Sequence, residues 1–144
     1  MNRNRTIHEV AFRLSYDIGE QIAPSLTNLK ISLPRQQLRA MRRVWAKGET
    51  TLADLCTTLK RDKGQVARII DELCNADLLV RKPNPRDGRS KLILLTPQGH
   101  QFFEAIEEIE AKFSSKLIEG ISKEDLEVFF RVSDQLSENI RTLK

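Results

Sequence analysis

The sequence predicts a mainly α-helical protein with one small β-hairpin. Apolar residues recur at steps of three and four through most of the 144 residues, which is the spacing of amphipathic helices. The exception is residues 78–95, where the β-forming runs LLVRK and KLILL flank the turn-prone segment NPRDGRS. Charged residues make up 31% of the chain, which favours a folded, helix-rich protein. Four helices are expected before the hairpin and two after it.

The first two predicted helices are defined by their apolar faces and by proline and glycine. The first spans about residues 5–29, and Pro24 should kink it or loosen its end because proline has no backbone N–H. The second begins at Pro34, which suits a first helical position, and ends at Gly48. The apolar face of the first helix consists of Ile7, Val10, Leu14, Ile18 and Ile22.

The third and fourth predicted helices begin with side chains that can cap them. Thr50 or Thr51 can cap a short third helix. The carboxylate of Asp62 can accept a hydrogen bond from the backbone N–H of Gln65, which marks the start of the fourth helix. One face of this helix is apolar and the opposite face carries long donor side chains. The apolar stripe consists of Val66, Ile69, Ile70 and Leu73.

Two helices are expected after the hairpin. Thr96 and Pro97 can cap and start a helix that extends to about residue 119, and Gly120 ends it. Ser122 starts the last helix. The terminal helices carry more apolar surface than a small domain can bury, so we expect them to pair with a second copy of the chain. The apolar residues after the hairpin are Phe102, Ile106, Ile109, Phe113, Leu117, Leu126, Phe129, Phe130, Leu136, Ile140 and Leu143.

This order of elements predicts the domain organisation. Three short helices followed by a hairpin match a helix-turn-helix with a wing. We therefore expect a winged helix-turn-helix DNA-binding lobe at residues 34–95, an N-terminal dimerisation helix at residues 1–33 and C-terminal dimerisation helices at residues 96–144.

Charge is distributed unevenly along the chain. Residues 34–95 hold 14 Lys and Arg against 7 Asp and Glu, whereas residues 96–144 hold 6 against 10. A basic central part suggests that this part meets a polyanion such as double-stranded DNA. Ordinary surface charge is the alternative explanation.

The fourth predicted helix carries side chains suited to reading a DNA duplex. Arg68 can form two hydrogen bonds to guanine, and Gln65 can pair with adenine. Ala67 could pack on a thymine methyl group, and Gly64 lets the backbone approach DNA at the start of the helix. Arg61 and Lys63 are better placed for phosphate. A solvated helix face is the alternative for these residues.

The tip of the hairpin concentrates positive charge. Arg86, Arg89 and Lys91 surround the turn at Asp87, and a thin arginine-bearing tip fits the narrow minor groove, whose potential is negative. We expect Asp87 to pair with Arg89 and to hold that side chain extended. Either Arg86 or Arg89 could enter the groove, and we favour Arg89. A solvated hairpin with a surface ion pair is the alternative.

Residues 62–99, DKGQVARIIDELCNADLLVRKPNPRDGRSKLILLTPQG, resemble the recognition helix and wing of the MarR family of winged helix-turn-helix regulators. The wing of that family usually reads Asp-Pro-x-Asp-x-Arg and leads to a Leu-Thr-x-x-Gly helix start. The one departure is Asn84 in place of the first Asp, so a turn contact made by a carboxylate does not carry over. The matching residues are Pro85, Asp87, Arg89, Leu95, Thr96 and Gly99.

The resemblance covers nearly the whole chain and implies a function. It implies a homodimer formed through the N- and C-terminal helices. It also implies binding to a palindromic DNA operator, usually as a repressor, with release by a small aromatic or phenolic ligand. In the family the ligand pocket lies between the dimerisation helices and the DNA-binding lobe. The candidate lining here is His8, Phe12, Tyr16, Met41, Trp45 and Phe113, for which ordinary core packing is the alternative.

Other classes of function have less support. A protein-interaction module that works through the acidic terminal helices is the alternative to a DNA-binding regulator. We expect no enzyme, cofactor or metal, because no catalytic triad, phosphate loop or metal cluster is visible. Cys56 and Cys74 lack zinc-site spacing and are expected to be buried thiols, or else a redox switch. Without an apolar run long enough to span a membrane or a secretory signal, a cytoplasmic location is expected.

Overall fold

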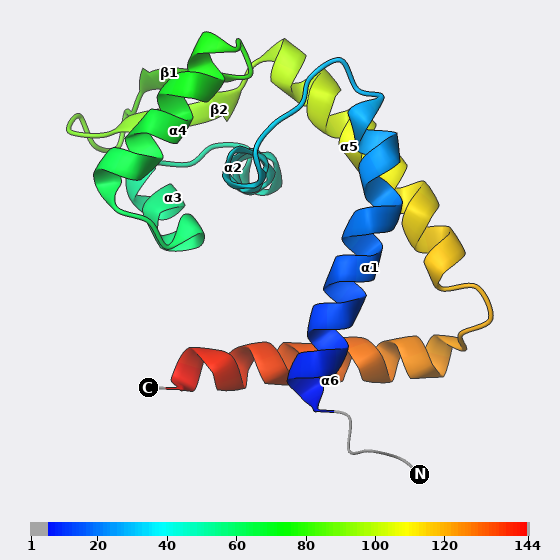
Figure 1. Cartoon of the computed structure of the whole chain (residues 1–144). Helices are drawn as coiled ribbons and strands as arrows, with labels where there is room; N and C mark the ends of the chain where they lie inside the picture. Colours follow the sequence, from blue (N-terminus) through cyan, green and yellow to red (C-terminus); the bar gives the residue numbers. More distant parts are fainter. Residues whose placement is uncertain (1–5, 144) are drawn as a thin grey trace. The chain divides into compact units, whose positions relative to one another are not determined.

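The computed structural model describes residues 6–143 and confirms a mainly α-helical chain with one β-hairpin (Figure 1). It divides into two compact units, of which the first runs to Glu110 and the second begins at Ala111. The predicted start of the first helix at residue 5 lies outside the described residues. The elements are α1 (Ile7–Thr27), α2 (Arg35–Lys47), α3 (Leu52–Leu59), α4 (Lys63–Asn75), β1 (Leu79–Pro83), β2 (Lys91–Leu95), α5 (Pro97–Leu117) and α6 (Lys123–Thr142).

Most helix ends lie where the side-chain chemistry predicts them. The hydroxyl of Thr51 accepts from a backbone N–H and caps α3, and Asp62 and Gln65 cap each other reciprocally at the start of α4. Gly48 ends α2 with a φ of 78°. The helix α2 begins at Arg35, one residue later than predicted. Pro34 lies just before α2 in an extended conformation, and its carbonyl accepts from the N–H of Leu38.

The core of the first unit lies between α2, α3, α4, the hairpin and the first half of α5. Three residues of the predicted stripe of α4 are buried in it, Val66, Ile70 and Leu73, each at most 1% exposed, and the fourth, Ile69, is partly buried against it. Phe103 of α5 is also fully buried, although the periodicity of the sequence indicated its neighbour Phe102. Both phenylalanines contribute, because the start of α5 is covered on a wider arc than a single stripe.

The hairpin is shifted by one residue from the prediction on its first strand. β1 begins at Leu79, which pairs with Leu95 in an antiparallel ladder. Leu78 instead uses its N–H to close the end of α4 and its carbonyl to accept from the N–H of Thr96. A third segment joins the ladder, because Thr50 and Ile93 exchange two backbone hydrogen bonds of 3.0 and 2.8 Å. The loop before α3 is thereby fixed to the hairpin.

The start of α5 packs against the base of the hairpin without space for a methyl group. A Cβ atom added at Gly99 would lie 2.2 Å from the carbonyl oxygen of Leu78. The hydroxyl of Thr96 accepts from the N–H of Gly99 at 2.9 Å and donates to the carbonyl of Asp77 at 2.5 Å. Glycine is therefore required at this position because of contact rather than backbone conformation.

The terminal helices bury few of their side chains within one chain. None of the described residues of α1 or α6 is fully buried. Large apolar side chains are exposed on both helices, for example Phe12 at 68% on α1 and Phe130 at 58% on α6. Within residues 6–143, no helix combines the length and apolar character needed to cross a membrane.

The carboxylate of Asp54 joins α2, the loop before α3 and α3 itself. It accepts two hydrogen bonds of 2.9 Å from the guanidinium of Arg43 and one of 2.6 Å from the hydroxyl of Thr50. The bond from Arg43 is the main reason that the pKa of Asp54 lies well below its usual range, and partial burial opposes this effect. Asp54 therefore stabilises the fold only while it is ionised.

We expect Asp54→Asn to lower the free energy of unfolding at pH 7 by roughly 1–3 kcal/mol, because an amide cannot replace a carboxylate that holds a guanidinium. The pKa of Asp54 is lower in the folded chain than in the unfolded chain, so its contribution is complete above about pH 4 and declines as the pH falls further. Urea unfolding at pH 7 and at pH 3 measures the difference. An equal deficit at both pH values would contradict the role of the charge.

Candidate nucleic-acid interface

The first two turns of α4 present the residues predicted to read DNA. Lys63, Gly64, Gln65 and Arg68 are all exposed, and Ala67 is half-buried. The Oε1 atom of Gln65 accepts from the backbone N–H of Asp62 at 3.3 Å. This bond orients the amide, and no other group among residues 6–143 binds its Nε2 atom. The cap that begins the helix therefore also positions one of the candidate base-reading side chains.

Arg68 is oriented by two residues that sequence reasoning missed. Its Nε atom donates to the Oε1 atom of Glu72 at 3.1 Å, one helical turn later. The other carboxylate oxygen of Glu72 accepts from the Nε2 atom of Gln37 in α2 at 2.6 Å. The spacing of four residues between Arg68 and Glu72 was visible in the sequence, whereas the contact from α2 was not.

The tip of the hairpin is shaped by side chains that bind its own backbone. The Oδ1 atom of Asn84 accepts from the N–H of Arg86 at 3.0 Å, and its Nδ2 group donates to the hydroxyl of Ser90 at 2.9 Å. Asn84 thus makes the turn contact itself, and its amide adds a second bond across the tip.

The prediction of an ion pair between the side chains of Asp87 and Arg89 is wrong. The carboxylate of Asp87 instead accepts from the backbone N–H of Arg89 at 3.0 Å, and within residues 6–143 no ion pair joins the two side chains. A carboxylate that bonds the backbone two residues later is a common turn geometry, and it needs no ordered guanidinium. Arg86 forms an ion pair with Glu49. Of the two tip arginines, Arg89 therefore keeps its guanidinium free among the described residues.

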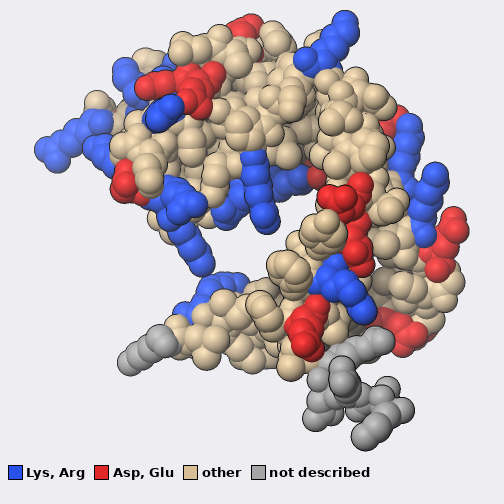
Figure 2. All heavy atoms as spheres, viewed as in Figure 1, with Lys and Arg blue, Asp and Glu red and all other residues tan. Residues whose placement is uncertain are grey.

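A groove separates α3 and the start of α4 from the hairpin. Its volume is about 590 Å³, and five of the ten predicted DNA-binding residues line it. In the space-filling view, Lys and Arg side chains protrude at the hairpin tip and along the edge formed by α3 and α4 (Figure 2). Arg61 lies in the turn before α4 and is not one of the residues that line this groove. The five lining residues are Lys63, Ala67, Asp87, Arg89 and Lys91.

Arg81 also lines this groove and was not predicted. It lies on β1, and its guanidinium donates to the carboxylate of Asp71 in α4 at 2.5 Å. The sulfur of Cys74 accepts from the same guanidinium at 3.6 Å. Burial raises the pKa of the Cys74 thiol. Cys56 is half-buried in the groove lining. Among residues 6–143 there is no group of three or more His, Cys, Asp and Glu able to hold a metal ion.

The sequence matches a known domain over the same region. A family model described as a winged helix DNA-binding domain matches residues 33–99. One relative is YdgJ of Bacillus subtilis (strain 168), an uncharacterized HTH-type transcriptional regulator. It is 21% identical over 112 residues, which cover 78% of this chain and 68% of YdgJ.

Two solved structures show the same fold over nearly the whole chain. A mutant of MarR from E. coli, complexed with operator DNA, is 18% identical with a TM-score of 0.72, covering 90% of this chain and 92% of that one. NadR in complex with 4-hydroxyphenylacetate is 22% identical with a TM-score of 0.76, covering 99% and 98%. Residues 33–99 therefore match a winged helix DNA-binding domain, and the chain shares the fold of the MarR structures. The resemblance inferred from the sequence is confirmed at the level of the fold.

Within the described part of the first unit, the candidate effector residues do not line one common pocket. His8 and Phe12 stack with ring centroids 6.5 Å apart, and Phe12 and Tyr16 border a shallow hollow on α1. Met41 is fully buried in the core of the lobe. The indole of Trp45 packs on Phe103 and donates to a carboxylate of α5. Phe113 belongs to the second unit and is half-buried there.

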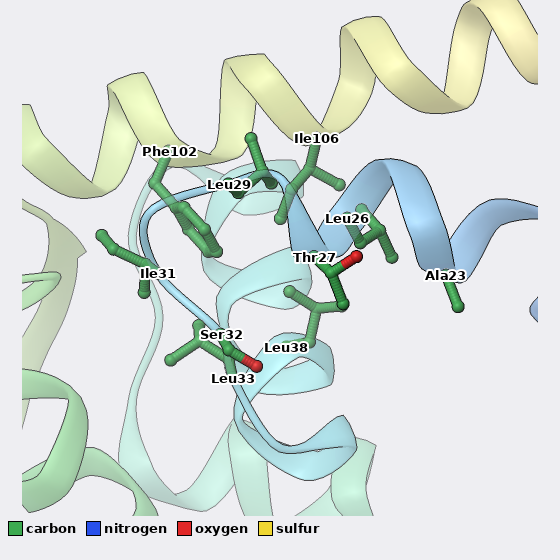
Figure 3. Close-up of a pocket in the computed structure, with 10 residues that line it drawn as sticks. All are labelled: Ala23, Leu26, Thr27, Leu29, Ile31, Ser32, Leu33, Leu38, Phe102 and Ile106. Carbon is green, nitrogen blue, oxygen red and sulfur yellow. The ribbon is translucent and has the colours of Figure 1, made fainter.

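A separate apolar pocket lies where the end of α1 and the loop after it meet α2 and α5. Its volume is about 190 Å³, and none of the candidate effector residues lines it. Phe102 and Ile106 point into it from α5, and Leu38 borders it from α2 (Figure 3). No charged side chain is part of the lining, so this pocket favours apolar groups over a free carboxylate.

We expect Arg89→Ala to weaken DNA binding by roughly tenfold with the fold intact, because it removes the tip arginine whose guanidinium has no partner within the described chain. Affinity for duplex DNA by fluorescence anisotropy measures the effect, and a thermal melt followed by circular dichroism checks the fold. Lys116→Ala, which removes one positive charge from the last turn of α5, is the matched control. Equal affinity of Arg89→Ala and the control would contradict the prediction.

Proposed function

We propose that the chain is a homodimeric, sequence-specific transcriptional repressor that binds a palindromic DNA operator and is released by a small aromatic or phenolic ligand. The observation that carries the proposal is the exposed donor face at the start of α4 beside a hairpin tip with a free arginine. A cytoplasmic location follows from DNA as the proposed partner.

The major groove is the proposed place of α4. An α-helix fits that groove, and Gln65 and Arg68 supply the donor and acceptor groups that distinguish base pairs. Lys63 and Arg61 are the proposed phosphate contacts, and Gly64 and Ala67 are the small residues that permit close approach. The hairpin is proposed to enter the adjacent minor groove with Arg89, while Arg86, Asp87 and Lys91 shape and flank the tip. The operator complex of E. coli MarR supports this arrangement by similarity of fold.

Dimerisation is proposed to proceed through residues 1–33 and 96–144, with residues 34–95 as the DNA-binding lobe. Single soluble chains seldom expose this much apolar surface on their helices. A symmetric partner would cover it and would present two copies of α4 to a two-fold symmetric operator. The exposed apolar residues that support this interface are Ile7, Phe12, Leu14 and Tyr16 of α1, and Val128, Phe129, Phe130, Val132, Ile140 and Leu143 at or beside α6.

A small ligand is proposed to relieve DNA binding. Support comes from NadR, which was solved with 4-hydroxyphenylacetate. The proposed contacts are His8, Phe12, Tyr16, Met41 and Trp45. The phenol or carboxylate of such a ligand would need a polar partner, which His8 and Tyr16 offer on one helix.

We expect Arg68→Ala to lower affinity for the preferred DNA sequence by about 1–3 kcal/mol and to reduce discrimination against other sequences, because the contact to guanine is lost. The preferred sequence would be obtained by selection from a random duplex pool, and affinities would be compared at two salt concentrations. Affinity should fall steeply with salt for both proteins. An equal loss on every sequence would show that Arg68 does not read bases.

We expect the purified chain to sediment as a dimer, and Phe130→Lys to shift it toward a monomer because a charge would enter an apolar interface. Analytical ultracentrifugation measures both. Gln135→Lys adds the same charge to the same helix outside its apolar stripe and serves as the control. A dimer unchanged by Phe130→Lys would place the interface elsewhere.

A further inference from the structure

The Arg68–Glu72–Gln37 cluster is more ordered than an exposed ion pair needs to be. The side chain of Arg68 is 83% exposed, and that of Glu72 is 45% exposed. Surface pairs of this kind contribute little stability, typically below about 1 kcal/mol. Nevertheless, each oxygen of the Glu72 carboxylate has its own donor, one from α4 and one from α2. Both ends of the carboxylate are thereby fixed.

The contact leaves a defined edge of the guanidinium free. Glu72 binds the Nε atom of Arg68, and no other described group binds its two Nη atoms. Those two atoms form the end of the guanidinium fork, which presents two parallel N–H donors. Guanine presents two acceptors, N7 and O6, along its edge in the major groove. An arginine held through Nε is therefore already oriented for that base.

We propose that Glu72, held in place by Gln37, is a positioning residue that gives the protein its sequence discrimination by orienting Arg68. The inference rests on the proposed DNA-binding function. Holding Arg68 in advance reduces the conformational entropy lost when it binds a base. The carboxylate of Glu72 also disfavours any DNA-bound arrangement in which the ion pair with Arg68 is broken. In such an arrangement Glu72 would face the DNA phosphates without its cationic partner. Both effects increase the difference in binding free energy between the preferred DNA sequence and other sequences.

Substitution of Glu72 by glutamine separates this role from simple attraction to DNA. Because the substitution removes a negative charge near DNA, affinity for random duplexes should rise, while discrimination between the selected sequence and random DNA should fall roughly 2- to 10-fold. Asp71→Asn removes the same charge one residue away, from a carboxylate that binds Arg81 instead. It should raise affinity for both kinds of DNA and leave the ratio unchanged.

Gln37→Ala removes the hydrogen bond that holds the Glu72 carboxylate, without changing any charge. It should reduce discrimination in the same direction as Glu72→Gln but by less, because Glu72 would keep Arg68 while losing its own support. Gln36→Ala, whose side-chain oxygen accepts from Arg39, is the matched control and should leave discrimination unchanged. Thermal melts of all variants identify any loss of fold.

The wild-type protein would select its preferred sequence from a random duplex pool, and every variant would be measured on that sequence and on random DNA. Lower discrimination for Arg68→Ala, Glu72→Gln and Gln37→Ala, with both controls unchanged, is the expected result. If Arg68→Ala loses discrimination but Glu72→Gln retains it, Glu72 does not position Arg68 and only this inference fails. If Arg68→Ala itself keeps full discrimination, the proposed reading of DNA by α4 fails as well.

Discussion

The DNA-binding lobe depends on the junction where Asp54 and Thr50 connect helices to the hairpin. The backbone of Thr50 pairs with Ile93 of β2, while its hydroxyl donates to the carboxylate of Asp54, which in turn holds Arg43 of α2. A two-stranded hairpin is only marginally stable alone. Its position relative to α3 and α4 is therefore set by this chain of hydrogen bonds together with the apolar core beneath it.

Charge in the lobe divides into cations with structural partners and cations left free. Arg42 binds Glu110 through two bonds and lies over the ring of Phe103, and Arg43 binds Asp54. Arg86 also has a structural partner, since it forms an ion pair with Glu49. Arg89 and Lys63 are free of protein partners in the described part of the chain, and both line one groove. Part of the positive charge of the region is thus presented along this groove.

Features set by neighbouring residues could be predicted from the sequence, and features set by distant contacts could not. The reciprocal cap of Asp62 and Gln65 and the turn at the hairpin tip involve residues two or three positions apart. The pairs Arg86–Glu49 and Gln37–Glu72 join residues 37 and 35 positions apart, so no local pattern reveals them. The expected Asp87–Arg89 ion pair failed because the backbone N–H is nearer and already ordered. The fully buried Phe103 was missed because one helical stripe does not describe a helix that is covered broadly.

The packing at Gly99 separates the hairpin into parts of different stability. At its base, Leu78, Thr96 and Gly99 share hydrogen bonds and backbone contact, so the strands and the first turn of α5 must open together. The tip at Asn84 and Ser90 lies beyond this junction and is held by its own short bonds and by the exposed ion pair of Arg86 with Glu49. Local opening can therefore occur at the tip without disturbing the base. The hairpin tip can therefore adapt to the width of a DNA groove while the base of the hairpin stays fixed to the helices.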